Sequence, residues 1–202
     1  MREKNGSQAL GMYLGNPAAH SSGALYGLAL RIALLTPNFF SASSIDQMPH
    51  EYAAWRVFGS NALVPITDID RTQRLVILGA NPAVSNGSLS IMPGAKRRIK
   101  AVRDRGGKVV VIDPRRTATC DIADRHLALA PGSDGGLFVG LLNAIAASGA
   151  ISGDFSDAPQ ALAIARNWDL DKVAQFCGLP RQQVAEFYSE FIAAPRAITL
   201  YT

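Results

Sequence analysis

Three short apolar runs constrain the fold of this chain more than any other feature of the sequence. They are 75–79 (LVILG), 108–113 (KVVVID) and 126–130 (HLALA). Residues 94–105, between the first two runs, place apolar side chains at helical spacing, and two glycines then end that helix. Apolar runs that alternate with helices are typical of a parallel sheet covered by helices on both faces. The sequence therefore predicts a Rossmann-like α/β fold in three layers, helix, sheet and helix.

The segments after the second run extend this pattern. Residues 117–124 form a candidate short helix, and 131–149 (PGSDGGLFVGLLNAIAASG) indicate a turn followed by a mostly buried helix. Residues 169–192 predict two helices joined by a Gly-Leu-Pro turn. The final residues, RAITLYT, predict a strand that pairs with a segment outside this chain.

The first third of the chain repeats the strand, turn and helix of the later part. GMYLGNPAAHSSG (11–23) and LVILGANPAVSNG (75–87) both pass from an apolar run through an Asn-Pro turn toward a helix. We therefore expect two related α/β units. Residues 1–60 belong to the first, 61–74 form a connection, and 75–202 form the second, with a helical tail over 154–193 and a truncated last strand.

The composition restricts the class of protein. Hydrophobic residues make up 48%, enough for a sizeable core, and no apolar run reaches the roughly 18 residues of a membrane span. The net charge of +4 suits an acidic small molecule or nucleic acid, and much of it lies in 96–105. The two cysteines have no metal-type spacing. We expect no membrane span and, by default, a cytoplasmic location, although an export signal upstream would change the latter.

Polar residues follow each of the three apolar runs, where an open parallel sheet binds its ligands. They are Gly79, Asn81, Ser85 and Asn86 after the first run, Asp113, Arg115, Arg116 and Thr117 after the second, and Gly132, Ser133 and Asp134 after the third. Glycines and helix starts favour phosphate, a carboxylate accepts from ribose hydroxyls or a guanine edge, and guanidinium groups donate to phosphate. Together the three turns predict a nucleotide-like ligand.

Each turn also has a purely structural interpretation. Gly-Ala-Asn-Pro is a common turn, Asp113 can cap a helix, the two arginines can form surface ion pairs, and Ser133 or Asp134 can cap the helix that follows. The succession of all three turns favours the ligand. It is not an ordinary dinucleotide or P-loop site, because neither G-x-G-x-x-G after a strand nor G-x-x-x-x-G-K-[ST] occurs.

The same segments resemble the molybdopterin oxidoreductases, which include formate dehydrogenases, nitrate reductases and dimethyl sulfoxide reductase. The resemblance is carried by ILGANPAVSNGS, GGKVVVIDPRRTATCDIADRHLALAPGSDGGLFVGLLNAI and GLPRQQVAEF, and it runs from about residue 11 to the end. It implies the central-domain fold of dimethyl sulfoxide reductase and formate dehydrogenase. It also implies a molybdenum or tungsten bis-molybdopterin guanine dinucleotide cofactor.

By resemblance, the three turns would hold the guanosine and diphosphate end of one dinucleotide. Gly79, Asn81, Ser85 and Asn86 would line the phosphate side, and Asp113, Arg115 and Thr117 would meet ribose, guanine or phosphate. The Gly132, Ser133 and Asp134 turn would close over the guanosine.

The metal ligand of the family would lie on SASSIDQMP (41–49), where the position of Pro49 points to Asp46 as metal ligand and catalytic residue. A carboxylate is a suitable hard ligand for oxidised molybdenum. The alternative is that Ser43, Ser44 and Asp46 cap a helix over 49–58. His20, after the first Asn-Pro turn, is a candidate for facing the pterins, with a cap or surface role as the alternative.

The resemblance implies an oxidoreductase with two-electron chemistry at the metal and a small substrate such as formate, nitrate or a sulfur compound. Electrons would leave through iron–sulfur centres to a partner protein, and the cysteine cluster for such a centre is expected only upstream of this chain. Half of the cofactor cage would also lie outside it. We therefore expect the 202-residue chain alone to be inactive and to bind the cofactor weakly or not at all.

Two other classes of function compete with this interpretation. The first is a non-catalytic scaffold like the large iron–sulfur subunit of respiratory complex I, although the intact polar turns favour a bound cofactor. The second is nucleic-acid binding, suggested by the basic segment 96–105 and the helical pair over 169–192. The apolar stripe of Val184, Phe187, Tyr188 and Phe191 favours packing for that pair, so we expect no nucleic-acid partner.

Overall fold

The computed structural model describes residues 2–15, 18, 21–90, 92–151 and 158–201. The chain divides into two compact units, Met1–Pro65 and Ile66–Thr202. The boundary falls within the segment 61–74, for which the sequence predicts a connection.

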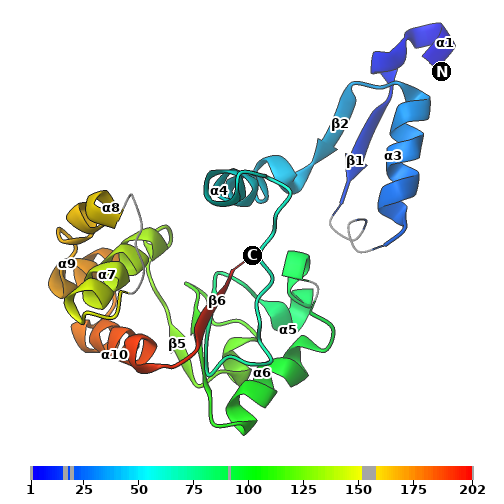
Figure 1. Ribbon diagram of the computed structural model, residues 1–202. Helices are drawn as coiled ribbons and strands as arrows, with labels where there is room; N and C mark the ends of the chain where they lie inside the picture. Colours follow the sequence, from blue (N-terminus) through cyan, green and yellow to red (C-terminus); the bar gives the residue numbers. More distant parts are fainter. Residues whose placement is uncertain (1, 16–17, 19–20, 91, 152–157, 202) are drawn as a thin grey trace. The chain divides into compact units, whose positions relative to one another are not determined.

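The first unit is a small β–α–β arrangement with a further helix (Figure 1). Its elements in chain order are α1 (Arg2–Asn5), η1 (Ser7–Ala9), β1 (Gly11–Leu14), α3 (Gly23–Leu34), β2 (Asn38–Ser41), η2 (Ala42–Ser44) and α4 (Met48–Phe58). The strands are parallel, with Gly11 opposite Asn38. The Thr36 hydroxyl donates to the Leu10 carbonyl over 2.5 Å and accepts from the Asn38 amide, which ties the start of β2 to the start of β1.

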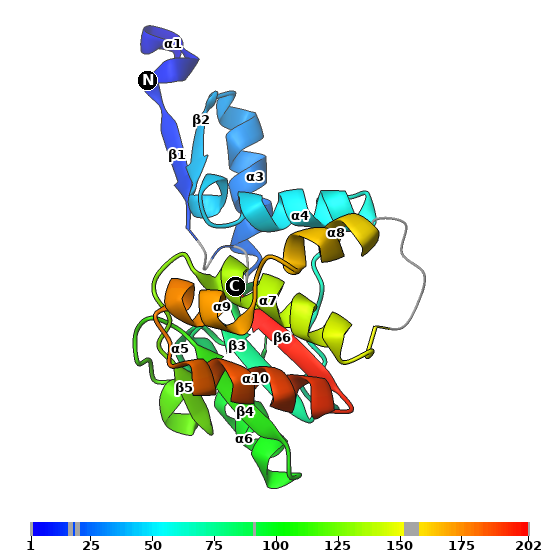
Figure 2. The same cartoon turned by 90° about the vertical axis from the view of Figure 1, so that its left-hand side faces the viewer.

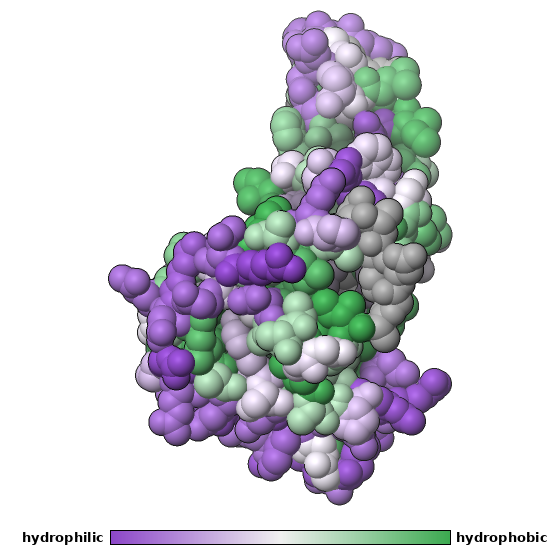
Figure 3. All heavy atoms as spheres, turned by 60° about the vertical axis from the view of Figure 1, so that its left-hand side comes forward, coloured by the Kyte–Doolittle hydropathy of each residue, from purple (hydrophilic) through white to green (hydrophobic). Residues whose placement is uncertain are grey.

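Most apolar side chains of the first unit are exposed. Helix α3 has no buried residue, and Tyr26, Ile32 and Leu25 are each more than 60% exposed. Part of the surface of this unit is accordingly hydrophobic in Figure 3. Amphipathic helices normally bury one apolar stripe, whereas the first unit leaves the apolar side chains of α3 unburied.

The second unit contains a four-stranded parallel sheet with the order β5-β4-β3-β6. Its elements are β3 (Arg74–Leu78), α5 (Pro82–Ser85), η3 (Ser88–Ser90), α6 (Ala95–Asp104), β4 (Lys108–Ile112), η4 (Cys120–Ile122), β5 (Arg125–Leu127), α7 (Asp134–Ala147), α8 (Ala158–Ala165), α9 (Leu170–Cys177), α10 (Arg181–Ala193) and β6 (Ala197–Tyr201). The chain adds β4 and β5 on one side of β3 and then returns to place β6 on its other side. The switch of direction therefore lies between β3 and β6, where open α/β sheets bind ligands.

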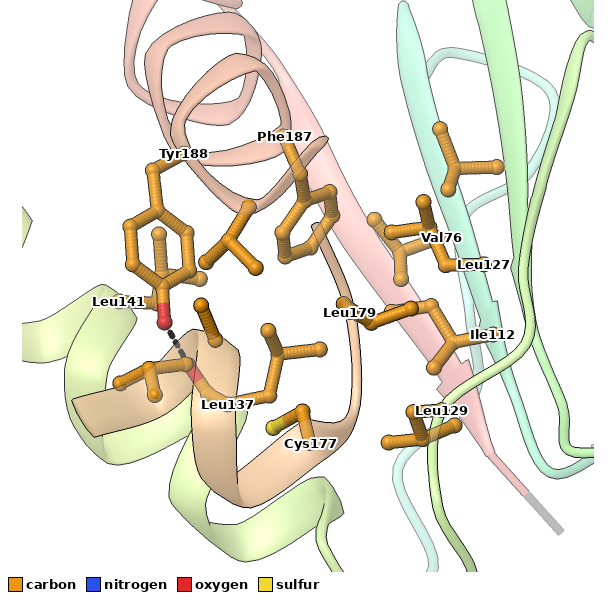
Figure 4. Packing of buried hydrophobic residues seen from close by; sticks show 14 residues of the cluster. Val76, Ile112, Leu127, Leu129, Leu137, Leu141, Cys177, Leu179, Phe187 and Tyr188 are labelled. Atoms are coloured by element: carbon orange, nitrogen blue, oxygen red, sulfur yellow. Dashed lines mark hydrogen bonds between the residues drawn. The ribbon is translucent and has the colours of Figure 1, made fainter. Parts of the chain in front are cut away.

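Both faces of the sheet are buried, because successive strand residues point to opposite sides. Leu75, Ile77, Val109 and Val111 pack with Ile99 and Val102 of α6 on one face. On the other face Val76, Val110, Ile112 and Leu127 meet residues of α7, α9 and α10, including Leu137, Val184 and Phe187 (Figure 4). Figures 1 and 2 show the two helical layers on opposite sides of the strands. The predicted three-layer α/β fold is confirmed.

Helices α7, α9 and α10 approach one another closely. A Cβ atom on Gly140 would lie 2.4 Å from Val173 Cγ2 and 2.5 Å from Tyr188 Oη. The Tyr188 hydroxyl donates over 2.6 Å to the Leu137 carbonyl, also in α7 (Figure 4). The helical pair 169–192, considered above as a nucleic-acid reader, therefore has its apolar stripe committed to this packing.

Two segments differ from the sequence-based expectations. Residues 117–124 contain a single 3-10 turn, η4, rather than an α-helix, because the buried Thr117 is bonded to Cys120 within the loop and the buried Thr119 is bonded to Asn81 and Ala83 outside it. The last strand does not need a partner outside the chain: β6 pairs in parallel with β3 over its full length, from Arg74 opposite Ala197 to Leu78 opposite Tyr201.

Candidate functional site at the carboxyl edge of the sheet

The strand register brings the three polar turns to one edge of the second unit. Leu78, Ile112 and Leu127 end their strands side by side. The Gly79 amide then donates to the Ile112 carbonyl (2.9 Å), and the Asp113 amide donates to the Leu127 carbonyl (3.2 Å). Because the strands are parallel, the residues that follow them leave the sheet at this same edge.

The first turn is shaped by Gly79 and Asn81. Gly79 has φ +58°, and a Cβ atom there would meet no atom within 4 Å, so the backbone is left-handed and open to its surroundings. Asn81 occupies the N-cap position of α5 without capping it through its own side chain. Further along, the Ser85 hydroxyl accepts from the Gly87 amide (3.3 Å), and Asn86 has a left-handed backbone at φ +53°.

Thr119, from the loop after β4, supplies the missing cap. Its hydroxyl accepts from the Ala83 amide (3.2 Å) and donates to Asn81 Oδ1 (2.7 Å). Thr119 is fully buried. The first and second turns are therefore joined by a side-chain contact that the sequence analysis missed. The available signal was the second threonine of Thr-Ala-Thr after the two arginines.

The second turn is held by Asp113 and His126. Asp113 Oδ1 accepts from the Arg115 amide (2.8 Å), and His126 Nε2 lies 2.8 Å from the Asp113 carbonyl oxygen, to which it donates as the Nε2–H tautomer. Asp113 thus shapes its own turn and does not cap η4. His126 is a second contact that sequence reasoning did not identify.

The two arginines of the second turn differ. Arg116 pairs with Asp121 over 2.9 Å, with both side chains more than 60% exposed, which is the surface ion pair of the structural alternative. Arg115 is exposed and forms no ion pair within the described residues. Thr117 is buried, and its amide donates to Cys120 Sγ over 3.3 Å. Of the two guanidinium groups, that of Arg115 is the one free to meet a ligand.

The third turn places a helix start at the same edge. Gly132 has φ +78°, and the buried Ser133 uses its hydroxyl to donate to the Ala130 carbonyl (2.6 Å), so no side chain caps α7. The first amides of a helix have no intrahelical acceptor and carry a partial positive charge. Asp134 is exposed in this first turn. The turn therefore offers backbone donors and one carboxylate.

A buried thiol lies directly behind this turn. Cys177 Sγ donates to the Ser133 carbonyl over 3.5 Å. Burial raises the pKa of the Cys177 thiol above its ordinary value, and the negative charge of Asp134 adds to this effect. Cys177 is thus a neutral packing residue that supports the turn.

Asp46 lies in the first unit, between η2 and α4, and its side chain is exposed. Helix α4 begins after Gln47 without a side-chain cap, and Ser41 is the residue that accepts from the Ser43 amide. The capping alternative for Asp46 is therefore wrong. Among the described residues there is no group of three or more His, Cys, Asp or Glu side chains that could hold a metal ion. His20 lies outside the described residues.

The two parallel α/β units and the polar turns at one sheet edge agree with a match to known proteins. Residues 20–183 match the family model of molybdopterin oxidoreductases. The chain belongs to the molybdopterin oxidoreductase family. Membership implies a molybdenum or tungsten pterin cofactor.

Individual members of the family share long segments with this chain. It is 69% identical to a nitrate reductase of Klebsiella oxytoca over 136 residues, which are 67% of this chain and 15% of that protein. It is 28% identical to the F420-dependent formate dehydrogenase 2 subunit alpha of Methanococcus maripaludis over 177 residues, covering 85% and 25%. The acetylene hydratase from Pelobacter acetylenicus has the same fold, with a TM-score of 0.73 and 23% identity over all of this chain and 27% of that one.

The chain therefore spans a quarter or less of the length of these two molybdopterin oxidoreductase relatives. Among the described residues, no helix is both long and apolar enough to cross a membrane.

Proposed function

We propose that the second unit holds the guanosine diphosphate end of a molybdopterin guanine dinucleotide in a two-electron oxidoreductase. The observation that carries this proposal is the common edge of the three turns. Asn81 and the first turn of α7 offer N–H donors for phosphate, Arg115 offers a free guanidinium, and the carboxylates of Asp113 and Asp134 suit ribose hydroxyls and the guanine N–H edge. These donors and acceptors fit a dinucleotide end without any further group.

The geometry of each turn supports the role that we propose for its residues. Gly79, with its open left-handed backbone, permits close approach of the diphosphate. Ser85 and Asn86 extend the donor set along the same loop, Thr117 orders the second turn, and Gly132 and Ser133 set the path into α7. The bound group would supply the redox-active metal, and the chain's own residues bind and orient its nucleotide end.

The proposal also covers the metal ligand and the substrate of the whole enzyme. Asp46 is our candidate metal ligand and catalytic residue in the first unit, since its exposed carboxylate is not used as a helix cap. Nitrate is the favoured substrate because of the 69% identity to a nitrate reductase, with formate second. An iron–sulfur centre and an electron-transfer partner outside the described residues, and a cytoplasmic location, complete the proposal.

The test uses the enzyme in its full length, with Asp113→Ala and Arg115→Ala as variants. Guanine nucleotide released on denaturation is measured per protein chain. We expect the unaltered enzyme to release it in stoichiometric amount and each variant to lose most of it. Arg116→Ala is the matched control, because Arg116 is engaged with Asp121 and should leave the nucleotide in place.

A non-catalytic scaffold predicts a different result. The unaltered protein would then release no guanine nucleotide, and the Asp113 and Arg115 variants would match it. That outcome would contradict the proposal.

A further inference from the structure

The contact between Thr119 and Asn81 determines whether the side-chain oxygen or the side-chain nitrogen of Asn81 faces the solvent. Thr119 is fully buried, and its hydroxyl oxygen accepts from the Ala83 amide. The hydroxyl proton then needs an acceptor, because a buried donor without a partner is costly. Asn81 Oδ1, at 2.7 Å, is the acceptor that the structure provides.

This requirement fixes the orientation of the Asn81 side chain. If the amide were flipped, Asn81 Nδ2 would donate to Thr119, and the Thr119 proton would have no acceptor inside the loop. With Oδ1 turned inward, Nδ2 is the outward atom. Within the described part of the chain Asn81 Nδ2 makes no hydrogen bond, and it is not among the buried side-chain atoms that lack one, so it is open to solvent.

We propose that Thr119 is a positioning residue that presents Asn81 at the carboxyl edge as a pure hydrogen-bond donor for an anion. An asparagine side chain alone offers an acceptor and two donors with equal ease. Engaging its oxygen leaves two N–H groups, which match phosphate oxygens and would not repel them. By capping α5 in the place of Asn81, Thr119 also keeps that side chain available. The inference rests on the proposed function and deepens it.

The experiment compares Thr119→Val, which removes the hydroxyl at nearly constant shape, with Thr119→Ser, which keeps it. Thr72→Val is the matched control. Thr72 is also a buried threonine with a bonded hydroxyl, but it lies beside Arg74 and Arg196, at the opposite edge of the sheet. Two readouts are taken on the whole chain by nuclear magnetic resonance: hydrogen exchange of the Ala83 amide, and a titration with guanosine diphosphate, for which weak, millimolar binding is sufficient.

We expect Thr119→Val to lose exchange protection at Ala83 and to bind guanosine diphosphate about tenfold more weakly, the effect of one lost hydrogen bond to a charged group. Thr119→Ser should restore both within about threefold, and Thr72→Val should change neither.

Two results separate the inference from the proposed function. If the unaltered chain binds guanosine diphosphate and Thr119→Val binds it equally well, the positioning role is wrong and the site stands. If the unaltered chain does not respond to guanosine diphosphate at all, the positioning role is wrong even though the Ala83 contact is present, and the proposed function is judged separately by the guanine nucleotide that the full-length enzyme releases. Equal weakening by Thr72→Val would also overturn the inference, because it would show a general loss of stability.

Discussion

The close contact of α7 with α9 and α10 yields a prediction whose size follows from the structure. Gly140→Ala would place a Cβ atom 2.4 Å from Val173 Cγ2 and 2.5 Å from Tyr188 Oη, both far below van der Waals contact. Val173 is stiff and fully buried, so the tyrosine must move and give up its 2.6 Å bond to the Leu137 carbonyl.

The magnitude combines three effects. Overpacking costs about 2 kcal/mol, the buried hydrogen bond about another 2 kcal/mol, and the better helix propensity of alanine returns about 1 kcal/mol. We therefore expect Gly140→Ala to lower the free energy of unfolding of the second unit by about 3 kcal/mol. Urea denaturation followed by circular dichroism measures it, and the midpoint should fall by about 1.5 M for an m value of about 2 kcal/mol/M.

Two variants make this reasoning refutable. Gly135→Ala lies in the same helix with no atom within 4 Å of the added Cβ, so we expect no loss of stability and a gain of at most about 1 kcal/mol from helix propensity. Tyr188→Phe should cost less in the Gly140→Ala background than alone, because its bond is already lost. A loss below about 1 kcal/mol for Gly140→Ala, or equal effects at the two glycines, would contradict this reasoning, because it would show that the helices move apart at little cost to accept the added methyl group.

Two further predictions concern charge. Glu190→Gln removes the carboxylate paired with the buried Arg74 and should destabilise the second unit by about 2 kcal/mol, less than is usual for a buried pair because Glu190 is 42% exposed. Asp171→Asn removes one partner of an exposed pair and should cost less than about 0.5 kcal/mol in the same urea assay. Burial raises the pKa values of Cys177 and Tyr188 above their ordinary values of 9.0 and 10.0, so as the pH rises the unfolded chain loses these protons before the folded chain does. The free energy of unfolding should therefore be highest below pH 9 and fall as the pH rises further. A double Cys177→Ala, Tyr188→Phe variant should show a smaller fall, and an unchanged slope would exclude both groups as its source.

The fold could be predicted from the sequence because its signals are local. Short apolar runs such as 108–113 and a one-sided helix at 94–105 fix the layer order, and parallel strands must deliver the turns that follow them to one edge. The partner of the final strand was not predicted because it is β3, which lies 123 residues earlier in the chain, as in the pair Arg74 and Ala197. No local pattern records such a pairing.

The sequence predicted that the three polar turns share one edge of the sheet, but it did not predict the contacts that hold these turns. The sequence places Asn81 in the first polar turn, but it does not reveal that Thr119, 38 residues away, caps α5 in its place. Likewise, the donor that His126 presents to the Asp113 carbonyl depends on the pairing of β4 with β5. Such contacts arise from tertiary structure, and spacing alone does not reveal them.

Exposure in the first unit was also beyond the sequence. Residues 24–35 are largely apolar, and yet Leu25 and Ile32 of α3 are exposed.

The most direct test of the account maps guanosine diphosphate onto the chain by ¹H–¹⁵N nuclear magnetic resonance. If the three turns form one nucleotide-binding edge, the backbone amides of 79–86, 113–117 and 132–135 should shift together with a single dissociation constant. The amide resonances of Arg74, Lys108 and Arg125, at the amino edge of the sheet, should not shift. Shifts confined to one turn, or centred on the amino edge, would contradict the claim that these turns grip a common nucleotide.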